Sequence, residues 1–330
     1  MGEFGLIDKI KSIVGRPGHK VIKGIGDDCA VIDASGKKLL LLTTDLLVEG
    51  VHFRKDFIAP EKLGRKALAV NISDVAAMGG KPLYALLSLA APREIDVAYI
   101  DDIVSGIAAM AVESEVELVG GDVSLSSQTI VINIALIGEV DGDNALYRSG
   151  AAPGQAIFVT GQLGASAAGL DILNRGVRIE KYASLIDSHI SPRPHLKEAE
   201  ILSSSGVVAS LIDVSDGLVS DLGHICQESK VGAILKQTEL PIPDKCRQYC
   251  EDFKLNPLSF ALYGGEDYVL LGTIPDHSFY GLRELMKSRG CMLYVIGKVT
   301  DESGIRLQGE SGIIREVAPG GYDHFRSEQD

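Results

Sequence analysis

The stretch KKLLLLTTD, residues 37–45, places a carboxylate, Asp45, directly after a continuous apolar run. A short apolar run that ends in polar residues predicts a buried β-strand. The stretch QTIVINIALIGEV, residues 128–140, predicts a second strand in the same half of the chain. The two strands are expected to form a sheet at the core of the N-terminal half. In a half of roughly 150 residues, such a sheet has limited means of burying both faces and both edges within one chain.

Further elements follow on both sides of this stretch. The segments 61–80 and 100–115 predict helices, and 116–122 predicts a strand. The segments 156–176 and 207–225 each predict a strand, a turn and a helix. Because strands and helices do not alternate strictly, a doubly wound parallel sheet is not required. The predicted fold class is α/β of the mixed, α+β kind.

The length and one polar loop predict two domains. A chain of 330 residues is long for a single core. The segment DGDNALYRSGAAPGQ, residues 141–155, is polar and rich in turn formers. We expect one domain at 1–147 and another at 148–330.

The composition excludes several classes of partner. The net charge of −13 argues against nucleic acid and against an anionic membrane surface, because both require basic patches. The longest apolar runs are too short to span a bilayer, and the first thirty or so residues lack the apolar core of a signal peptide. The five cysteines contain no C-x-x-C pair, which indicates reduced, buried thiols in a cytoplasmic protein.

Aspartates recur where predicted strands end. GIGDDCA, residues 24–30, holds the pair Asp27 and Asp28, and similar positions are occupied by Asp45, Asp122, Asp213 and Asp216, while Asp74 lies on the predicted helix 61–80. Strand ends are where mixed folds gather ligand groups. Carboxylates that converge there repel one another unless cations lie between them, and an all-oxygen site suits Mg²⁺ with a phosphate ligand. These residues therefore predict a metal–phosphate site.

Each aspartate also has a simpler interpretation. An Asp after a strand commonly forms a turn or caps a helix. The chain has no G-x-x-x-x-G-K-[ST] motif and no protein-kinase motif set. TGQLGASAAG, residues 160–169, either holds an anion at a helix N-terminus or only packs strand against helix. Spacing alone therefore leaves a metal–phosphate enzyme as one of two interpretations.

Longer motifs distinguish these interpretations. Besides GIGDDCA, the chain contains TTDLLVEGVHF (43–53), ALAVNISDVAAMGG (67–80), LVGGD (118–122), RSGAAPGQ (148–155), VSDGLVSDLGH (214–224), YGGEDY (263–268) and GGYDHF (320–325). In this order, from near the N-terminus to the last residues, they resemble the thiamine-monophosphate kinase family of the aminoimidazole ribonucleotide synthetase superfamily. The pair VEGVHF and GYDHF is the most specific part of the resemblance.

The resemblance implies a fold and a reaction. The fold is the two-domain aminoimidazole ribonucleotide synthetase-like one: an N-terminal ATP- and Mg-binding domain that forms a β-barrel across a homodimer, and a C-terminal α/β domain that completes the active site. The reaction is ATP-dependent phosphorylation of thiamine monophosphate to thiamine diphosphate, the last step of its biosynthesis. It proceeds by direct in-line transfer with several Mg²⁺ ions. Because the attacking phosphate oxygen is already ionised, no catalytic acid or base is expected.

Site residues are carried over motif by motif. Of the two aspartates in GIGDDCA, the second, Asp28, matches the family's metal ligand, so Asp27 is expected to shape the turn. The resemblance implies metal ligands at Asp28, Thr43, Thr44, Asp45, Asp74, Asp122, Asp213 and Asp216, ATP contacts at Gly121, Asp122, Arg148 and Ser215, and thiamine monophosphate contacts at His52, Glu266 and Tyr322. The family usually has Thr after GGD, where this chain has Val123, so any role of that hydroxyl is lost or passes to Ser124.

Two kinds of alternative remain. A sibling synthetase of the superfamily is one, but residues 1–28 hold no Cys for selenophosphate chemistry, and the chain ends FRSEQD without the terminal Cys of the hydrogenase maturation protein. A non-catalytic protein that binds nucleotide or thiamine phosphate is the other. Intact carboxylates argue against it, and ADP release with thiamine monophosphate distinguishes the two.

Overall fold

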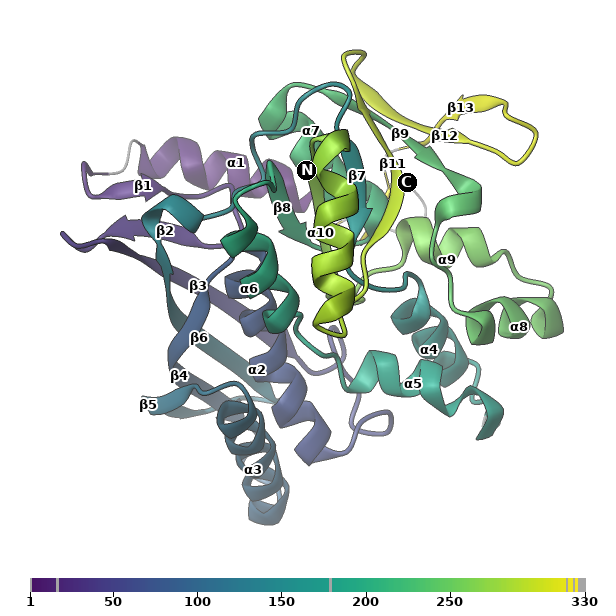
Figure 1. The fold of residues 1–330 in the computed structure, drawn as a ribbon. Coiled ribbons are helices and arrows are strands. Elements are labelled where there is room, and N and C mark those ends of the chain that lie inside the picture. Colours follow the sequence, from purple (N-terminus) through teal and green to yellow (C-terminus); the bar gives the residue numbers. More distant parts are fainter. Residues whose placement is uncertain (1, 16–17, 178–179, 319, 323, 326–330) are drawn as a thin grey trace.

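The computed structural model describes residues 2–15, 18–177, 180–318, 320–322 and 324–325 and contains two β-sheets (Figure 1). The strands of the first sheet are β1 (Val21–Lys23), β2 (Ala30–Asp33), β3 (Lys38–Val48), β4 (Lys81–Ala91), β5 (Glu117–Leu125) and β6 (Val131–Asp141), in the order β1-β2-β3-β6-β4-β5. All neighbouring pairs are antiparallel except β4 and β5, which are parallel.

The apolar stretches that predicted strands form the middle of this sheet. Residues 37–45 lie in β3, which continues to Val48, and 128–140 corresponds to β6. Strand β4 was not predicted, because it follows the end of a helix directly and has a proline, Pro82, at its second position. From Tyr84 to Leu89 exposed residues alternate with buried ones, as in a sheet with one covered face.

Two helices cover one face of the first sheet. They are α2 (Pro60–Ala77) and α3 (Val97–Glu113), close to the predicted 61–80 and 100–115. Ile72 of α2 and Ile107 of α3 share one hydrophobic cluster with Leu41 and Ile134 of the sheet. Helix α2 is almost wholly buried and lies between the two domains (Figure 1). Its polar side chains can therefore contact both.

The other face of this sheet keeps large apolar side chains in solvent. Leu46, Tyr84 and Leu86 are 41–48% exposed. Side chains alternate between faces along a strand, so these residues point away from α2 and α3. This outer face is suited to packing against a further layer of protein. The β-barrel between two chains stays a prediction.

The second sheet has helices on both faces. Its strands are β7 (Ala156–Val159), β8 (Ser210–Asp213), β9 (Gly232–Lys236), β10 (Leu270–Ile274), β11 (Tyr294–Thr300), β12 (Gly304–Gln308) and β13 (Ile314–Glu316), in the order β13-β12-β9-β11-β7-β10-β8. The helices are α4 (Ala165–Asn174), α5 (Ala183–Ile190), α6 (Leu196–Ser205), α7 (Leu218–Ser229), α8 (Asp244–Phe253), α9 (Pro257–Tyr263) and α10 (Asp276–Ser288), with short 3-10 turns at Gly142–Asn144, Glu180–Tyr182 and Gln237–Glu239.

Alternation along β7 explains this second arrangement. Ile157 and Val159 belong to the cluster that contains α4, α7 and α8, whereas Ala156 and Phe158 belong to the cluster that contains α6 and α10. The predicted strand–turn–helix units at 156–176 and 207–225 are β7–α4 and β8–α7. The expected mixed α/β fold with two domains is confirmed.

Helix α1 (Glu3–Val14) connects the chain start to the second domain. It begins near α7 and runs toward β1 (Figure 1). The Phe4 ring centroid is 4.7 Å from that of His224 on α7. No residue of α1 is buried, so the helix lies on the surface. The contact of Phe4 with His224 joins its beginning to the second domain.

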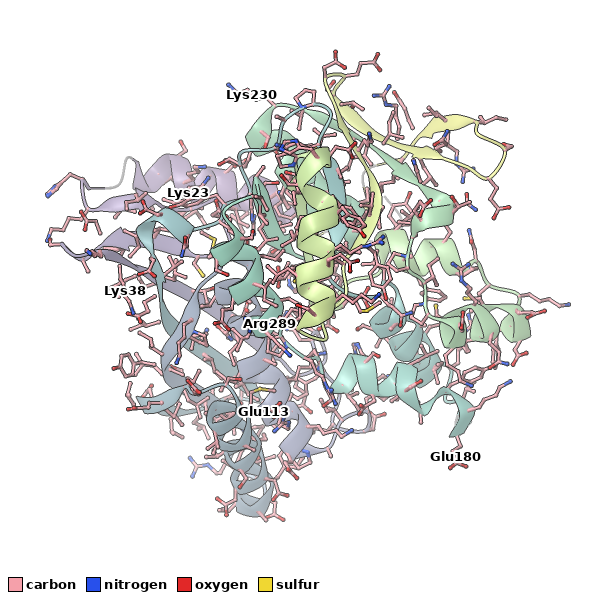
Figure 2. All side chains as sticks on the ribbon, in the orientation of Figure 1. Lys23, Lys38, Glu113, Glu180, Lys230 and Arg289 are labelled. Atoms are coloured by element: carbon pink, nitrogen blue, oxygen red, sulfur yellow. The ribbon has the colours of Figure 1, made fainter. Side chains whose placement is uncertain are left out.

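Charged side chains of both signs extend from the surface of both domains. Figure 2 labels Lys38 and Glu113 on the first domain and Lys230 and Arg289 on the second. In the part of the chain that the structure describes, no helix is long and apolar enough to cross a membrane. The five cysteines are buried and unbonded, as expected for reduced thiols.

Candidate active site

A cleft of about 2100 Å³ lies between the two domains. Its walls come from α1, β3, α2, the loop after β8, the turn at 265–268, the segment 320–322 and His324. Except for α1, these segments carry predicted motifs. The cleft is therefore the candidate active site.

Three aspartates from separate elements meet in this cleft. Carboxylate oxygens of Asp28, Asp74 and Asp213 all lie within 4.8 Å of one another. Burial and the Asp28 charge raise the pKa of Asp213 to about 8, and the same two causes raise the pKa of Asp45 to about 6. Burial, then Asp45 and Asp213, raise the pKa of Asp74 well above its ordinary value. Such a cluster of hard oxygen donors fits Mg²⁺, which would relieve the repulsion.

Polar side chains of α2 and β3 hold the cluster. The Thr43 hydroxyl donates to the Asp74 carboxylate at 2.5 Å, and the Ser73 hydroxyl donates to the Asp213 carboxylate at 2.5 Å. The amide oxygen of Asn71 accepts the backbone N–H of Asp45 at 3.0 Å. Ser73 and Asn71 were not assigned a role from the sequence, because only the packing of α2 against β3 and β8 brings them to these partners.

The pair Asp27–Asp28 has two distinct environments. Arg148 lies beside Asp28, with Nη2–Oδ1 at 2.8 Å and Nε–Oδ2 at 3.4 Å. Asp27 accepts the backbone N–H groups of Asp28 and Arg148 at 3.2 and 3.3 Å and lies 3.2 Å from the Lys23 ammonium. Burial and Asp28 raise the pKa of Asp27 to about 6. Asp27 thus orders the turn, while Asp28 faces the cluster and the predicted ATP contact Arg148.

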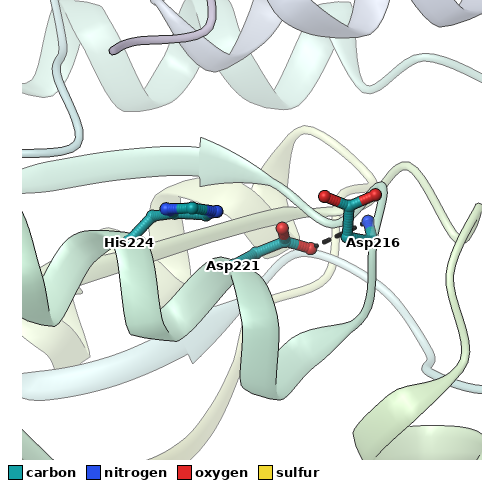
Figure 3. A group of neighbouring side chains, drawn as sticks. All are labelled: Asp216, Asp221 and His224. Carbon is teal, nitrogen blue, oxygen red and sulfur yellow. Dashed lines mark hydrogen bonds between the residues drawn. The ribbon is translucent and has the colours of Figure 1, made fainter. Parts of the chain in front are cut away.

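A second acidic group follows the predicted ATP contact Ser215. Ligand atoms of Asp216, Asp221 and His224 lie within 4.8 Å of one another (Figure 3). The Asp221 carboxylate accepts the N–H groups of Asp216 and Gly217 at 3.2 and 3.1 Å. Burial, with Arg148 second, lowers the pKa of His224 to about 4. Sequence analysis missed Asp221 and His224, although their three-residue spacing places them on one face of α7.

The predicted acceptor contacts lie on two parts of the wall. His52 Nδ1 accepts the N–H of Val48 at 2.9 Å, and its Nε2 is 3.3 Å from Nε2 of His324. The Tyr322 ring centroid is 4.8 Å from that of His324. Burial, with His324 second, lowers the pKa of His52. His52 and Tyr322 therefore belong to one aromatic group, which also includes His324.

Glu266 is held by an ion pair with Lys66 and by a contact with the imidazole of His189. Its carboxylate is 3.0 Å from the Lys66 ammonium and 3.0 Å from His189 Nδ1. Burial opposes ionisation, but Lys66 and His189 hold the pKa of Glu266 at about 2. The carboxylate is therefore an anion throughout the physiological pH range.

Three predicted residues are not brought to the cluster by this chain. Gly121 and Asp122 lie on β5, which is separated from β3 by β6 and β4. Gly121 has φ +157°, and a Cβ there would lie 1.8 Å from the carbonyl oxygen of Leu87, so the close strand contact requires glycine. The Thr44 hydroxyl accepts from Asn133 at 2.8 Å on the outer face of the sheet. Asp122 is exposed. In the register of β4 and β5 it lies opposite Ser88, which is also exposed on that outer face.

The raised pKa values predict a pH effect on stability. A carboxyl group with a raised pKa in the folded state stabilises most below its unfolded pKa and loses this contribution as pH rises through the folded pKa. For Asp45 and Asp213 this window runs from about pH 4 to about pH 8. We expect the melting temperature of chelator-treated protein to fall from pH 5 to pH 8 and added Mg²⁺ to restore it more at pH 8. An equal Mg²⁺ effect at both pH values would contradict a carboxylate metal site.

Comparison with known proteins agrees with the geometry. Residues 26–140 match the family described as AIR synthase related protein, N-terminal domain, and residues 152–310 match its C-terminal domain. Thiamine-monophosphate kinase of Aquifex aeolicus is 37% identical over 329 residues, and that of Escherichia coli K12 is 37% identical over 333 residues. Each alignment covers 98% of both chains.

A similar solved structure is described as AaThiL complexed with AMPPCP and TMP. It superimposes on this chain with a TM-score of 0.87 at 36% identity. The match covers 98% of this chain and 97% of that one. Both domains and the cleft between them are thus included.

Proposed function

Because the chain belongs to the thiamine-monophosphate kinases of the AIR synthase related family, we propose that its cleft transfers the γ-phosphoryl group of ATP to thiamine monophosphate, with thiamine diphosphate and ADP as products. The observation that carries this proposal is the cluster of Asp28, Asp74 and Asp213 in the cleft. A site with this much negative charge binds phosphates only through cations.

The chain's residues act by positioning and by holding charge. Several Mg²⁺ ions, when bound, would neutralise the phosphates of both substrates. We assign their ligands to Asp28, Asp74 and Asp213, with Thr43, Asp45 and Asp216 beside them. Arg148 and Ser215 would hold the ATP phosphates, since a guanidinium binds phosphate oxygens in pairs. The acceptor phosphate is the nucleophile of a direct in-line transfer and needs no general base.

We propose that the active protein is a homodimer whose chains share the site. The outer face of the first sheet carries the exposed side chains of Leu46, Tyr84 and Leu86, and burying them against a second copy is favourable. Thr44, Gly121 and Asp122 belong to the part of the sheet that would meet the partner. Their proposed metal and ATP roles then require the second chain. We also place the enzyme in the cytoplasm, where five buried thiols stay reduced.

Acceptor binding is proposed for the aromatic group and Glu266. His52→Ala and Tyr322→Ala are expected to raise KM for thiamine monophosphate by about tenfold and to change KM for ATP by less than about twofold. Their rings lie together on the cleft wall, where a heteroaromatic substrate can stack. Steady-state kinetics with each substrate varied in turn would measure this. Equal increases in both KM values would show that the two side chains act through folding.

A coupled assay of ADP release tests the function. Thiamine monophosphate, thiamine, an aminoimidazole precursor and no acceptor are compared at saturating ATP and Mg²⁺. The proposal expects ADP release only with thiamine monophosphate. Release with another acceptor would favour a sibling synthetase, and binding without release would favour a non-catalytic binding protein.

A further inference from the structure

Lys66 is a buried cation that the sequence did not assign to any function. Its side chain, on α2, is 1% exposed. The ammonium group lies 3.0 Å from each carboxylate oxygen of Glu266 and donates to the backbone carbonyl of His189 at 3.1 Å. These three oxygens match the three N–H donors of an ammonium group, so none remains for a phosphate. Lys66 therefore acts on Glu266 and not directly on a substrate.

Glu266 has a backbone conformation that its surroundings must maintain. Its φ is +63°, in the left-handed region that non-glycine residues rarely adopt. Its N–H donates to the carbonyl of Ser215 at 2.7 Å. The side chain is 26% exposed and lines the cleft. The carboxylate is thus fixed from behind and open toward the cleft.

The Glu266 carboxylate keeps hydrogen-bonding capacity on that open side. Lys66 contacts both oxygens, and His189 contacts Oε2 at 3.0 Å. A carboxylate offers about four lone-pair sites. The capacity that is left suits a ligand with an N–H donor or a positive charge. Thiamine monophosphate has both, in its aminopyrimidine and its thiazolium ring.

We propose that Lys66 is a positioning residue for the acceptor: it holds Glu266 in place on the cleft wall at a fixed distance from the metal cluster. This rests on the proposed function. The same helix α2 carries Ser73 and Asp74 about two turns after Lys66. A helix of eight residues is about 12 Å long, which sets the separation of Lys66 and Asp74 along the axis. One rigid helix therefore fixes the position of Glu266, through Lys66, and the positions of Asp74 and Asp213, the latter through Ser73.

Lys66→Met tests the proposal, and Lys62→Met is the matched control. Lys62 lies one turn earlier on α2 and pairs with Asp187 at 2.6 Å on the exposed surface. For Lys66→Met we expect Kd for thiamine monophosphate, measured by calorimetry without ATP, to rise about tenfold. KM for thiamine monophosphate should rise in parallel, while KM for ATP stays within about twofold. Lys62→Met should change none of these. An unchanged Kd, or equal rises in both KM values, would overturn the proposal.

A double variant separates positioning from folding. Lys66→Met alone leaves a carboxylate without its cation, which destabilises the fold. Lys66→Met/Glu266→Gln removes both charges and should recover the wild-type melting temperature while Kd stays weak. Wild-type affinity in the double variant would overturn the proposal. Wild-type protein that binds thiamine monophosphate but releases no ADP would instead contradict the proposed reaction, and the Kd comparison would still decide the role of Lys66.

Discussion

Asp74→Asn is expected to lower turnover by about a thousandfold, equivalent to about 4 kcal/mol of transition-state stabilisation, and to raise the melting temperature of the metal-free protein. Asp74 is held among Asp28, Asp45 and Asp213, and burial and these charges raise its pKa. Asparagine has nearly the same shape and can still accept the Thr43 hydroxyl. The substitution therefore removes repulsion in the empty site and a ligand in the loaded one.

The opposite signs of the two effects make this prediction specific. Loss of activity through misfolding would lower the melting temperature, whereas loss of a metal ligand should not. Asp96→Asn is the control, because Asp96 caps α3 outside the cleft and Asn caps a helix equally well. It should alter neither quantity. Near-normal turnover of Asp74→Asn at saturating Mg²⁺ would show that the cluster is not the metal site.

Local patterns pointed to the carboxylate cluster, and the longer motifs decided in its favour. Asp213 ends β8, a strand that the segment 207–225 predicted, and Asp74 lies on a helix with small, apolar neighbours. Asp28 lies two residues before β2, for which no strand was predicted. Strand ends and a central helix converge in a mixed fold, so a meeting of these residues could be expected. Glu266 and Lys66 are 200 positions apart, and no local spacing connects them. Their pairing depends on how the second domain packs against α2.

The positions of Thr44 and Asp122 show a different limit. Adjacent residues of a strand point to opposite faces, so Thr43 and Thr44 could not both face one cluster. That rule was available from the sequence, and the motif resemblance grouped the two residues without it. The separation of Asp122 from β3 depends on the strand order β3-β6-β4-β5, in which β4 was not predicted. A single missing strand thus obscured which residues one chain brings together.

This separation leads to the second large effect, recovery of activity by mixing two inactive chains. If each site uses Asp74 from one chain and Asp122 from its partner, Asp74→Asn and Asp122→Asn homodimers are both inactive. In the mixed dimer one site carries both substitutions and the other carries neither. A purified mixed dimer is therefore expected to show about half of the wild-type turnover per dimer. Differently tagged chains, co-expressed and purified through both tags, would allow the measurement.

The control for this experiment combines two substitutions within one cluster. Asp74 and Asp213 lie within 4.8 Å in the same chain, so a mixed dimer of Asp74→Asn and Asp213→Asn keeps one defect in each site and should stay inactive. Light scattering should give about twice the 35.1 kDa chain mass for every sample, with or without ATP and Mg²⁺. A mixed Asp74→Asn and Asp122→Asn dimer without activity would place Asp122 outside the partner's site. A fully active monomer at micromolar concentration would contradict both the dimer and the shared site, because the outer face would then have no role in catalysis.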